Sequence, residues 1–115
     1  MIEQTIYDFL NDNMSVPVYT EIPNNPPKQM IVLEKTGSSL TNHIKRSTFA
    51  IQSYGKSLYE AANLNESLKE IMLDGLDGLL SLDEVAAVNL NSDYNYTDTT
   101  TKRYRYQAVF DIVHY

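Results

Sequence analysis

The chain has 115 residues, a net charge of −6 and no cysteine. The acidic balance argues against non-specific nucleic-acid binding, which needs a cationic surface to release counterions from phosphates. The lack of cysteine excludes disulfides and thiolate ligands or nucleophiles. The length predicts a single domain, residues 1–115, large enough to bury a core of its own.

Neither a targeting segment nor a membrane span is predicted from the sequence. The start, Met1 to Thr5, has no basic stretch followed by a long apolar run, so we expect no signal peptide. No apolar run approaches the length that crosses a bilayer.

The first third of the chain predicts a helix followed by two strands. Residues 2–13 place their apolar side chains on one helical face: Ile2, Ile6, Phe9 and Leu10. Residues 16–22 alternate as a first strand, and Pro17 favours an edge position for it. Residues 30–33 are apolar on both faces, which predicts an interior second strand.

A flexible connection is expected at residues 37–42, before a third strand at residues 43–54. Alternation along that strand puts Phe49 and Ile51 on one face. The other face carries Ile44, Ala50 and Tyr54.

A second helix is predicted to start at Ser57, because Glu60 follows three residues later in the pattern of a capping box. Gly75 is its predicted stop. Its expected inward side chains are Leu58, Ala61, Leu64, Leu68, Ile71 and Met72. A repeated Leu-Asp-Gly triplet, residues 73–75 and 76–78, forms the next loop.

Two more strands complete the prediction, at residues 85–90 and from Arg103 to the C-terminus. On the last strand one face carries Tyr104, Tyr106, Ala108, Phe110 and Ile112. The order α-β-β-β-α-β-β predicts an α+β fold: a mostly antiparallel sheet with two helices packed on one face.

No catalytic residue, cofactor site or metal site is predicted. His43 and His114 are the only histidines and lie far apart in sequence, whereas zinc takes three or four ligands. The acidic residues at positions 74–84 lack the alternating spacing of a calcium loop, so a solvated turn is expected there. No nucleophile-elbow, phosphate-loop or zinc-protease motif occurs.

The polar segment 91–102 is predicted to be a protruding hairpin arm. It is either a mobile tip or an interface arm, because tyrosine is favoured at protein contacts. The arginines that follow it allow three interpretations: exposed residues paired with acids, nucleic-acid contacts, or contacts with a neighbouring copy. The candidate interface residues are Asp93, Tyr94, Tyr96, Asp98, Arg103 and Arg105.

Five segments together resemble one group of proteins: Met1–Tyr7, Val16–Tyr19, Ile31–Lys35 after the proline turn, Phe49–Tyr54, and Tyr104–Ile112. With the capped second helix, they are similar to the small tail-completion proteins of long-tailed bacteriophages and prophages of Gram-positive bacteria. This group includes tail terminators and head–tail joining proteins. The resemblance covers nearly the whole chain.

The resemblance implies a structural virion protein without catalysis or cofactor. Its subunits would form a ring, commonly a hexamer, at the neck of the tail, with the tail tube protein and head connector proteins as partners. DNA would pass the lumen without specific binding, and the protein would be made in the cytoplasm of the bacterial host. The alternative is a small ligand-binding or regulatory module on a ferredoxin-like scaffold, since a fold does not fix function.

Overall fold

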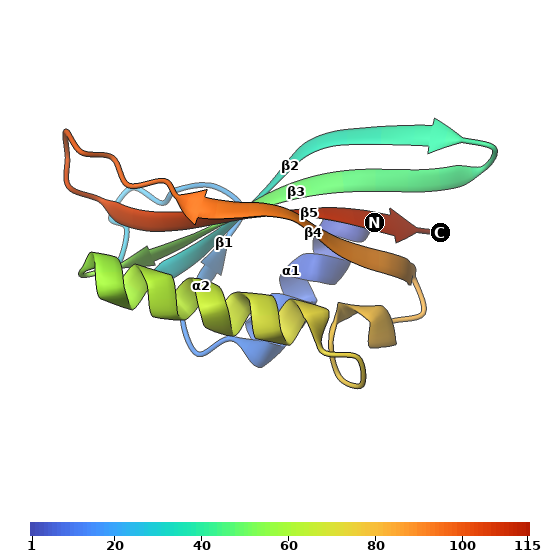
Figure 1. The fold of residues 1–115 in the computed structure, drawn as a ribbon, viewed down its shortest axis with the longest axis horizontal. Helices are drawn as coiled ribbons and strands as arrows, with labels where there is room; N and C mark the ends of the chain where they lie inside the picture. The colour runs from blue at the N-terminus through green and yellow to red at the C-terminus, as the bar shows by residue number, and fades with distance from the viewer.

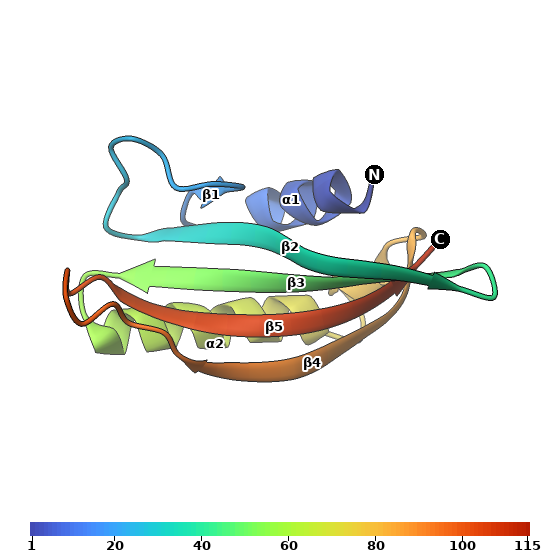
Figure 2. The same cartoon turned by 90° about the horizontal axis from the view of Figure 1, so that it is seen from above.

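Five strands form one sheet in the order β1-β2-β3-β5-β4, and two helices cover one of its faces (Figures 1 and 2). The computed structural model describes residues 1–115. The strands are β1 (Val18–Tyr19), β2 (Met30–Thr41), β3 (Ile44–Gly55), β4 (Val85–Asn95) and β5 (Tyr104–His114). Only the β1–β2 pair is parallel. The predicted α+β class and element order are confirmed, with one added 3₁₀ turn, η1 (Leu79–Ser81).

Helix α1 spans Ile2–Asn13, as predicted, and buries its apolar face. Its end is fixed by two hydrogen bonds to the last turn. The Asn13 side chain donates to the Phe9 carbonyl at 2.8 Å, and the Met14 amide donates to the Leu10 carbonyl at 2.8 Å. The second bond satisfies one of the last four carbonyls, which the helix itself leaves free.

Strand β1 is much shorter than the predicted strand at residues 16–22. Only Val18 and Tyr19 pair with β2. Pro17 precedes them and contributes only its carbonyl, which accepts from the Ile31 amide at 2.9 Å. The predicted edge position is confirmed, because β1 is the first strand of the sheet. A proline has no amide to donate, so the pairing begins after it.

Strand β2 contradicts the flexible connection expected at residues 37–42. The strand continues to Thr41 and pairs with β3 down to the Thr41–Ile44 pair. The two residues between them, Asn42 and His43, have φ angles of 52° and 66°. Two left-handed residues form the tight turn that matches the twist of paired strands. The resulting hairpin extends beyond the helices at one end of the molecule (Figure 1).

Helix α2 spans Leu58–Leu73, and Ser57 caps it by accepting the Glu60 amide at 3.2 Å. The reciprocal half of the predicted capping box is absent, because the Glu60 carboxylate accepts from the Gln29 side chain instead. Leu58 is 40% exposed, so its predicted inward position is wrong. The helix ends at Leu73 with Asp74 as its C-cap, so Gly75 stands directly after the cap, where a stop glycine is expected.

Strand β4 includes half of the segment predicted as a protruding arm. Residues 91–95 belong to β4, which is longer than the predicted strand at residues 85–90, and they pair with β5. The tip is therefore confined to residues 96–103. Backbone pairing explains the difference, because β5 offers hydrogen-bonding groups to these residues although their side chains stay exposed or half-buried.

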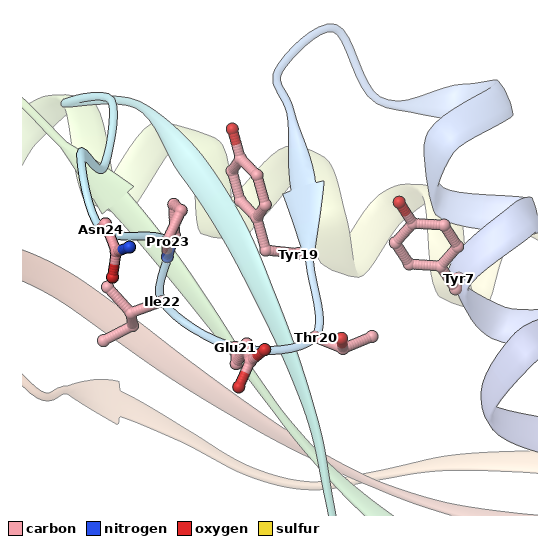
Figure 3. Close-up of a pocket in the computed structure, with 7 residues that line it drawn as sticks. All are labelled: Tyr7, Tyr19, Thr20, Glu21, Ile22, Pro23 and Asn24. Carbon is pink, nitrogen blue, oxygen red and sulfur yellow. The ribbon is translucent and has the colours of Figure 1, made fainter.

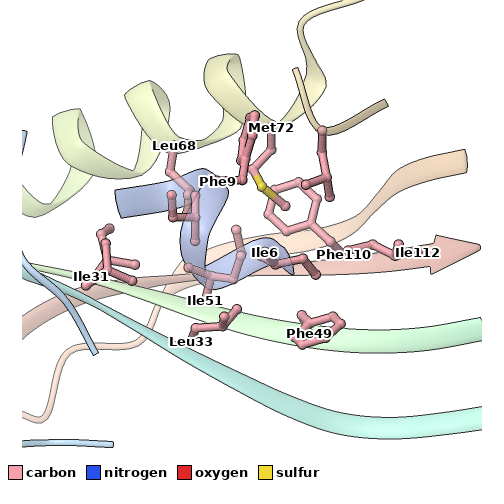
Figure 4. Close-up of a cluster of buried hydrophobic side chains, with 14 of the residues drawn as sticks. Ile6, Phe9, Ile31, Leu33, Phe49, Ile51, Leu68, Met72, Phe110 and Ile112 are labelled. Atoms are coloured by element: carbon pink, nitrogen blue, oxygen red, sulfur yellow. The ribbon is translucent and has the colours of Figure 1, made fainter. Parts of the chain in front are cut away.

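The core lies between the helices and the sheet (Figure 4). Phe49 and Phe110 are fully buried and face each other across β3 and β5. The predicted faces of these two strands are confirmed, since Ile51, Ala108 and Ile112 are also fully buried. The helices contribute Ile2, Ile6, Phe9, Leu10, Leu68 and Met72.

Truncation of Phe110 or Leu68 to alanine should lower the free energy of unfolding by about 2–5 kcal/mol, because each leaves a cavity in a closed core. Urea melts followed by circular dichroism measure the loss. Leu76→Ala is the matched control, since Leu76 is 85% exposed. A loss below about 0.5 kcal/mol for both core variants would contradict this assignment of the core.

Candidate assembly surface

The sheet face away from the helices carries a cluster of aromatic and arginine side chains. Tyr54 of β3 lies opposite Arg105 of β5 in the pairing register. Tyr94 comes from the end of β4, Tyr96 follows directly after that strand, and Arg103 precedes β5. We call these five residues the aromatic–arginine surface.

Arg105 occupies the centre of this surface. Its guanidinium lies 4.4 Å from the ring centroid of Tyr96 and 5.7 Å from that of Tyr54. It also donates to the Tyr54 hydroxyl at 2.9 Å and to the Tyr96 carbonyl at 2.7 Å. These contacts orient the side chain, and its guanidinium forms no salt bridge.

Two further contacts extend the surface. The Arg103 guanidinium lies 4.9 Å from the centroid of the Tyr54 ring. Tyr94 and Tyr96 pack edge to face, with centroids 5.8 Å apart and planes at 87°. The Tyr94 hydroxyl accepts from the Gln107 amide group, whose oxygen accepts from Gln52 at 2.7 Å. The surface is thus connected across three strands.

Asp93 has a different environment from the tyrosines next to it. Its carboxylate lies 2.7 Å from the Lys69 ammonium of α2, which also pairs with Glu66 at 2.7 Å. The ammonium donates hydrogen bonds to Asp93 and to Glu66, and both raise the pKa of Lys69, the bond to Asp93 more. Asp93 therefore connects β4 to α2 on the helix side.

Asp98 organises the tip of the arm. Its carboxylate accepts the backbone amides of Thr100 at 2.9 Å and Thr101 at 3.4 Å. These backbone hydrogen bonds lower the pKa of Asp98. A short carboxylate that accepts amides two and three residues later is a frequent way to close a turn.

The interpretation of Arg103 and Arg105 as acid-paired residues is wrong. The molecule has three salt bridges, and all of them use Lys35 or Lys69. Alternation does separate both arginines from Tyr104 and Tyr106, as predicted. Tyr96, which Arg105 contacts, lies on the predicted arm and is one of the predicted interface residues. Tyr54, which both arginines contact, comes from β3, and the sequence gave no signal of it.

The histidines are far from this surface and from each other in sequence. His43 lies in the exposed turn of the β2–β3 hairpin, and His114 is buried at the end of β5. The His114 ring nitrogen Nε2 lies 2.8 Å from the Ser47 hydroxyl. No three histidine, aspartate or glutamate side chains form a group that could hold a metal ion.

Two of the recesses along the sheet have tyrosines in their lining and lie near α1 or the open face. One, of about 500 Å³, lies between α1 and the segment after β1, with Tyr7 from α1 and Tyr19 from β1 in its lining (Figure 3). The other, of about 600 Å³, lies over the open sheet face and includes Tyr54, Tyr96 and Arg105. Glu21 is the one charged side chain in the lining of the first recess.

No protein-family model matches this chain, and no curated protein matches it in sequence. None of its helices is long and apolar enough to cross a membrane.

Replacing Tyr94 and Tyr96 together with serine should leave the protein folded, because these side chains are 42% and 44% exposed. The lost ring–ring and ring–arginine contacts are worth about 1–2 kcal/mol in total. In the ring that the resemblance implies, we expect the same variant to prevent assembly, measured by electron microscopy and sedimentation velocity.

Tyr59→Ser is the matched control, because Tyr59 is 77% exposed on α2. Unfolding of the double variant would show that the tyrosines are part of the core. Assembly at the wild-type yield would place the interface elsewhere.

Proposed function

We propose that this protein is a structural subunit of a phage virion, a tail terminator or tail-completion protein that forms a ring at the head–tail junction. Its partners would be further copies of itself, the tail tube protein and head connector proteins. The role needs no catalytic residue, cofactor or metal. It depends on surfaces that other subunits can contact.

The observation that carries the proposal is the agreement between the resemblance and the fold. The resembling segments run through nearly the whole chain, from Met1–Tyr7 to Tyr104–Ile112. The group implies an α+β subunit, and the chain has that architecture in the expected element order.

The exposed features of the molecule support the same proposal. The β2–β3 hairpin projects from the body with Leu40 at 65% and Ile44 at 43% exposure. Exposed apolar residues on an extended hairpin suit a contact with another subunit. The aromatic–arginine surface adds the residue types that are enriched at protein interfaces.

The net charge of −6 suits a protein whose ring surrounds passing DNA. An acidic subunit repels phosphates, so DNA would move through the lumen without being held. Specific nucleic-acid binding is not part of the proposal.

A small ligand-binding module is the second candidate, and one feature favours it. One split β-α-β unit is present: α2 connects β3 to β4 along the chain, and β5 lies between these two strands in the sheet. Ferredoxin-like scaffolds contain such units. The recess of about 600 Å³ over the open face would be its site. However, β1 joins β2 without a helix, so a second such unit is absent.

Deletion of the gene from its phage or prophage should yield heads and tails that are not joined, or tails of abnormal length. Electron microscopy of induced lysates measures this. Wild-type protein supplied in trans should restore joined particles, and Phe110→Ala should restore fewer because it unfolds more readily. Normal infectious particles from the deletion would contradict the proposal. Capsid and tail-tube genes on either side of this gene are also expected.

A further inference from the structure

One end of the molecule carries a cleft lined by cations. It has a volume of about 330 Å³ and lies where the start of β2, the start of α2 and the arm tip meet. Lys28, Lys56, Lys102 and Arg103 provide its charge, and Pro27 and Tyr104 are also in its lining. We call it the cationic cleft. Four of the nine lysines and arginines of an acidic protein gather there.

The cations of this cleft have no carboxylate partner within the subunit, although Arg103 also lies over the Tyr54 ring. None of the four cations forms a salt bridge. The nearby Glu60 carboxylate accepts from Gln29, and Asp98 accepts the amides of its own turn. No carboxylate is among the residues that line the cleft. The cleft thus fits an anionic group from outside the subunit.

A loop with acidic and apolar side chains on its surface follows α2. Residues 73–83, the acidic leucine loop, expose Leu76 at 85%, Leu80 at 48% and Leu73 at 43%. Asp74, Asp77 and Asp83 are exposed beside them. Exposed leucines flanked by charges are the composition of an interface core with a polar rim.

The acidic leucine loop is a formed structure. The Gly78 amide donates to the Asp74 carbonyl at 3.0 Å, and Asp74 Oδ1 accepts the Leu76 amide at 2.9 Å. Only glycine fits at position 78, because a Cβ there would lie 2.2 Å from the Asp74 carbonyl oxygen. Leu79 is fully buried and fixes the loop to the core. Leu76 therefore projects because the loop holds it outward.

These two features lie at opposite ends of α2. The cationic cleft is at the start of the helix and the acidic leucine loop at its end, along the longest dimension of 44 Å (Figure 1). Sixteen helical residues separate the two ends by about 24 Å. One subunit cannot bring the loop into its own cleft.

We propose that the acidic leucine loop of one copy docks into the cationic cleft of the next. Leu76 would contact Pro27 and Tyr104 of the neighbour, and Asp74 and Asp77 would pair with its Lys102 and Arg103. Each contact then joins two different surfaces. A contact of this kind closes a ring when the rotation between neighbouring subunits is a whole fraction of a full turn. This inference rests on the proposed ring and names its contact.

A second copy fits this cleft better than DNA does. The loop supplies leucine for the proline and tyrosine of the cleft, which a phosphate cannot. The rest of the subunit is acidic enough to repel a duplex. The loop and the cleft also occur once each per subunit, as a repeating head-to-tail contact requires.

Cysteine crosslinking tests the contact directly, because the chain has no cysteine of its own. Under oxidation, purified Leu76→Cys/Thr101→Cys protein should give a ladder of disulfide-linked oligomers on non-reducing gels. Each single variant should stay monomeric, and their equal mixture should stop at dimers. A double variant that stays monomeric at high concentration overturns the proposal, as do dimers of Leu76→Cys alone.

A charge exchange tests the pairing. In the cysteine variant, Asp77→Lys should lower the ladder yield at least tenfold, and so should Arg103→Glu. Asp74 is left unchanged, because its Oδ1 accepts the Leu76 amide within the loop. Asp77→Lys combined with Arg103→Glu should restore the yield. Glu70→Lys is the matched control for the first exchange, since it makes the same charge change at an exposed site elsewhere and should leave the yield unchanged. Failure of the combined variant to recover overturns the assigned pairs.

Two readouts separate this inference from the proposed function. A crosslinked ladder together with normal particles after gene deletion would contradict the phage role and support the contact. Unjoined particles after gene deletion, with joining fully restored by each charge-reversed protein, would contradict the contact and support the phage role. Duplex DNA binding that Lys102→Glu/Arg103→Glu abolishes, without any ladder, would assign the cleft to DNA and overturn the proposal.

Discussion

The register between β3 and β5 is the constraint on which the rest of the molecule depends. It sets Phe49 against Phe110 on the helix side and, by the same alternation, Tyr54 against Arg105 on the open side. A slip of one residue would exchange the two faces. Arg105 would then enter the core and Phe110 would face solvent. The core and the aromatic–arginine surface are therefore two results of one pairing.

Helix α2 connects this sheet to the ends of the molecule. Its buried side chains, Ala61, Leu68 and Met72, hold it along β3 and β5. Its two ends therefore have fixed positions: the first turn borders the cationic cleft, and the last turn leads into the acidic leucine loop. Packing in the middle of the helix thus sets the distance between two surfaces of opposite charge.

The distribution of charge informs the proposed function more than the net charge does. A net charge of −6 argues only that the subunit avoids non-specific contact with nucleic acid. The cationic cleft at the start of α2 and the acidic leucine loop at its end give the subunit two separate surfaces of opposite charge. Under the proposed contact these two surfaces would attract each other head to tail, and a contact of that kind can close into a ring. A small ligand-binding module would not require two separate surfaces of opposite charge.

The sequence alone determined the local features of this protein. The period of apolar residues predicted α1, and the Ser57 cap predicted the start of α2. Alternation identified the buried face of β5, because these signals depend on neighbours within a few residues. Only the tertiary structure decided the extent of the β2–β3 hairpin and the partners of Arg105. It also decided that Lys28, Lys56 and Lys102 share one cleft. Those outcomes depend on strand pairing between distant residues, and no local pattern of side chains records which strands will meet.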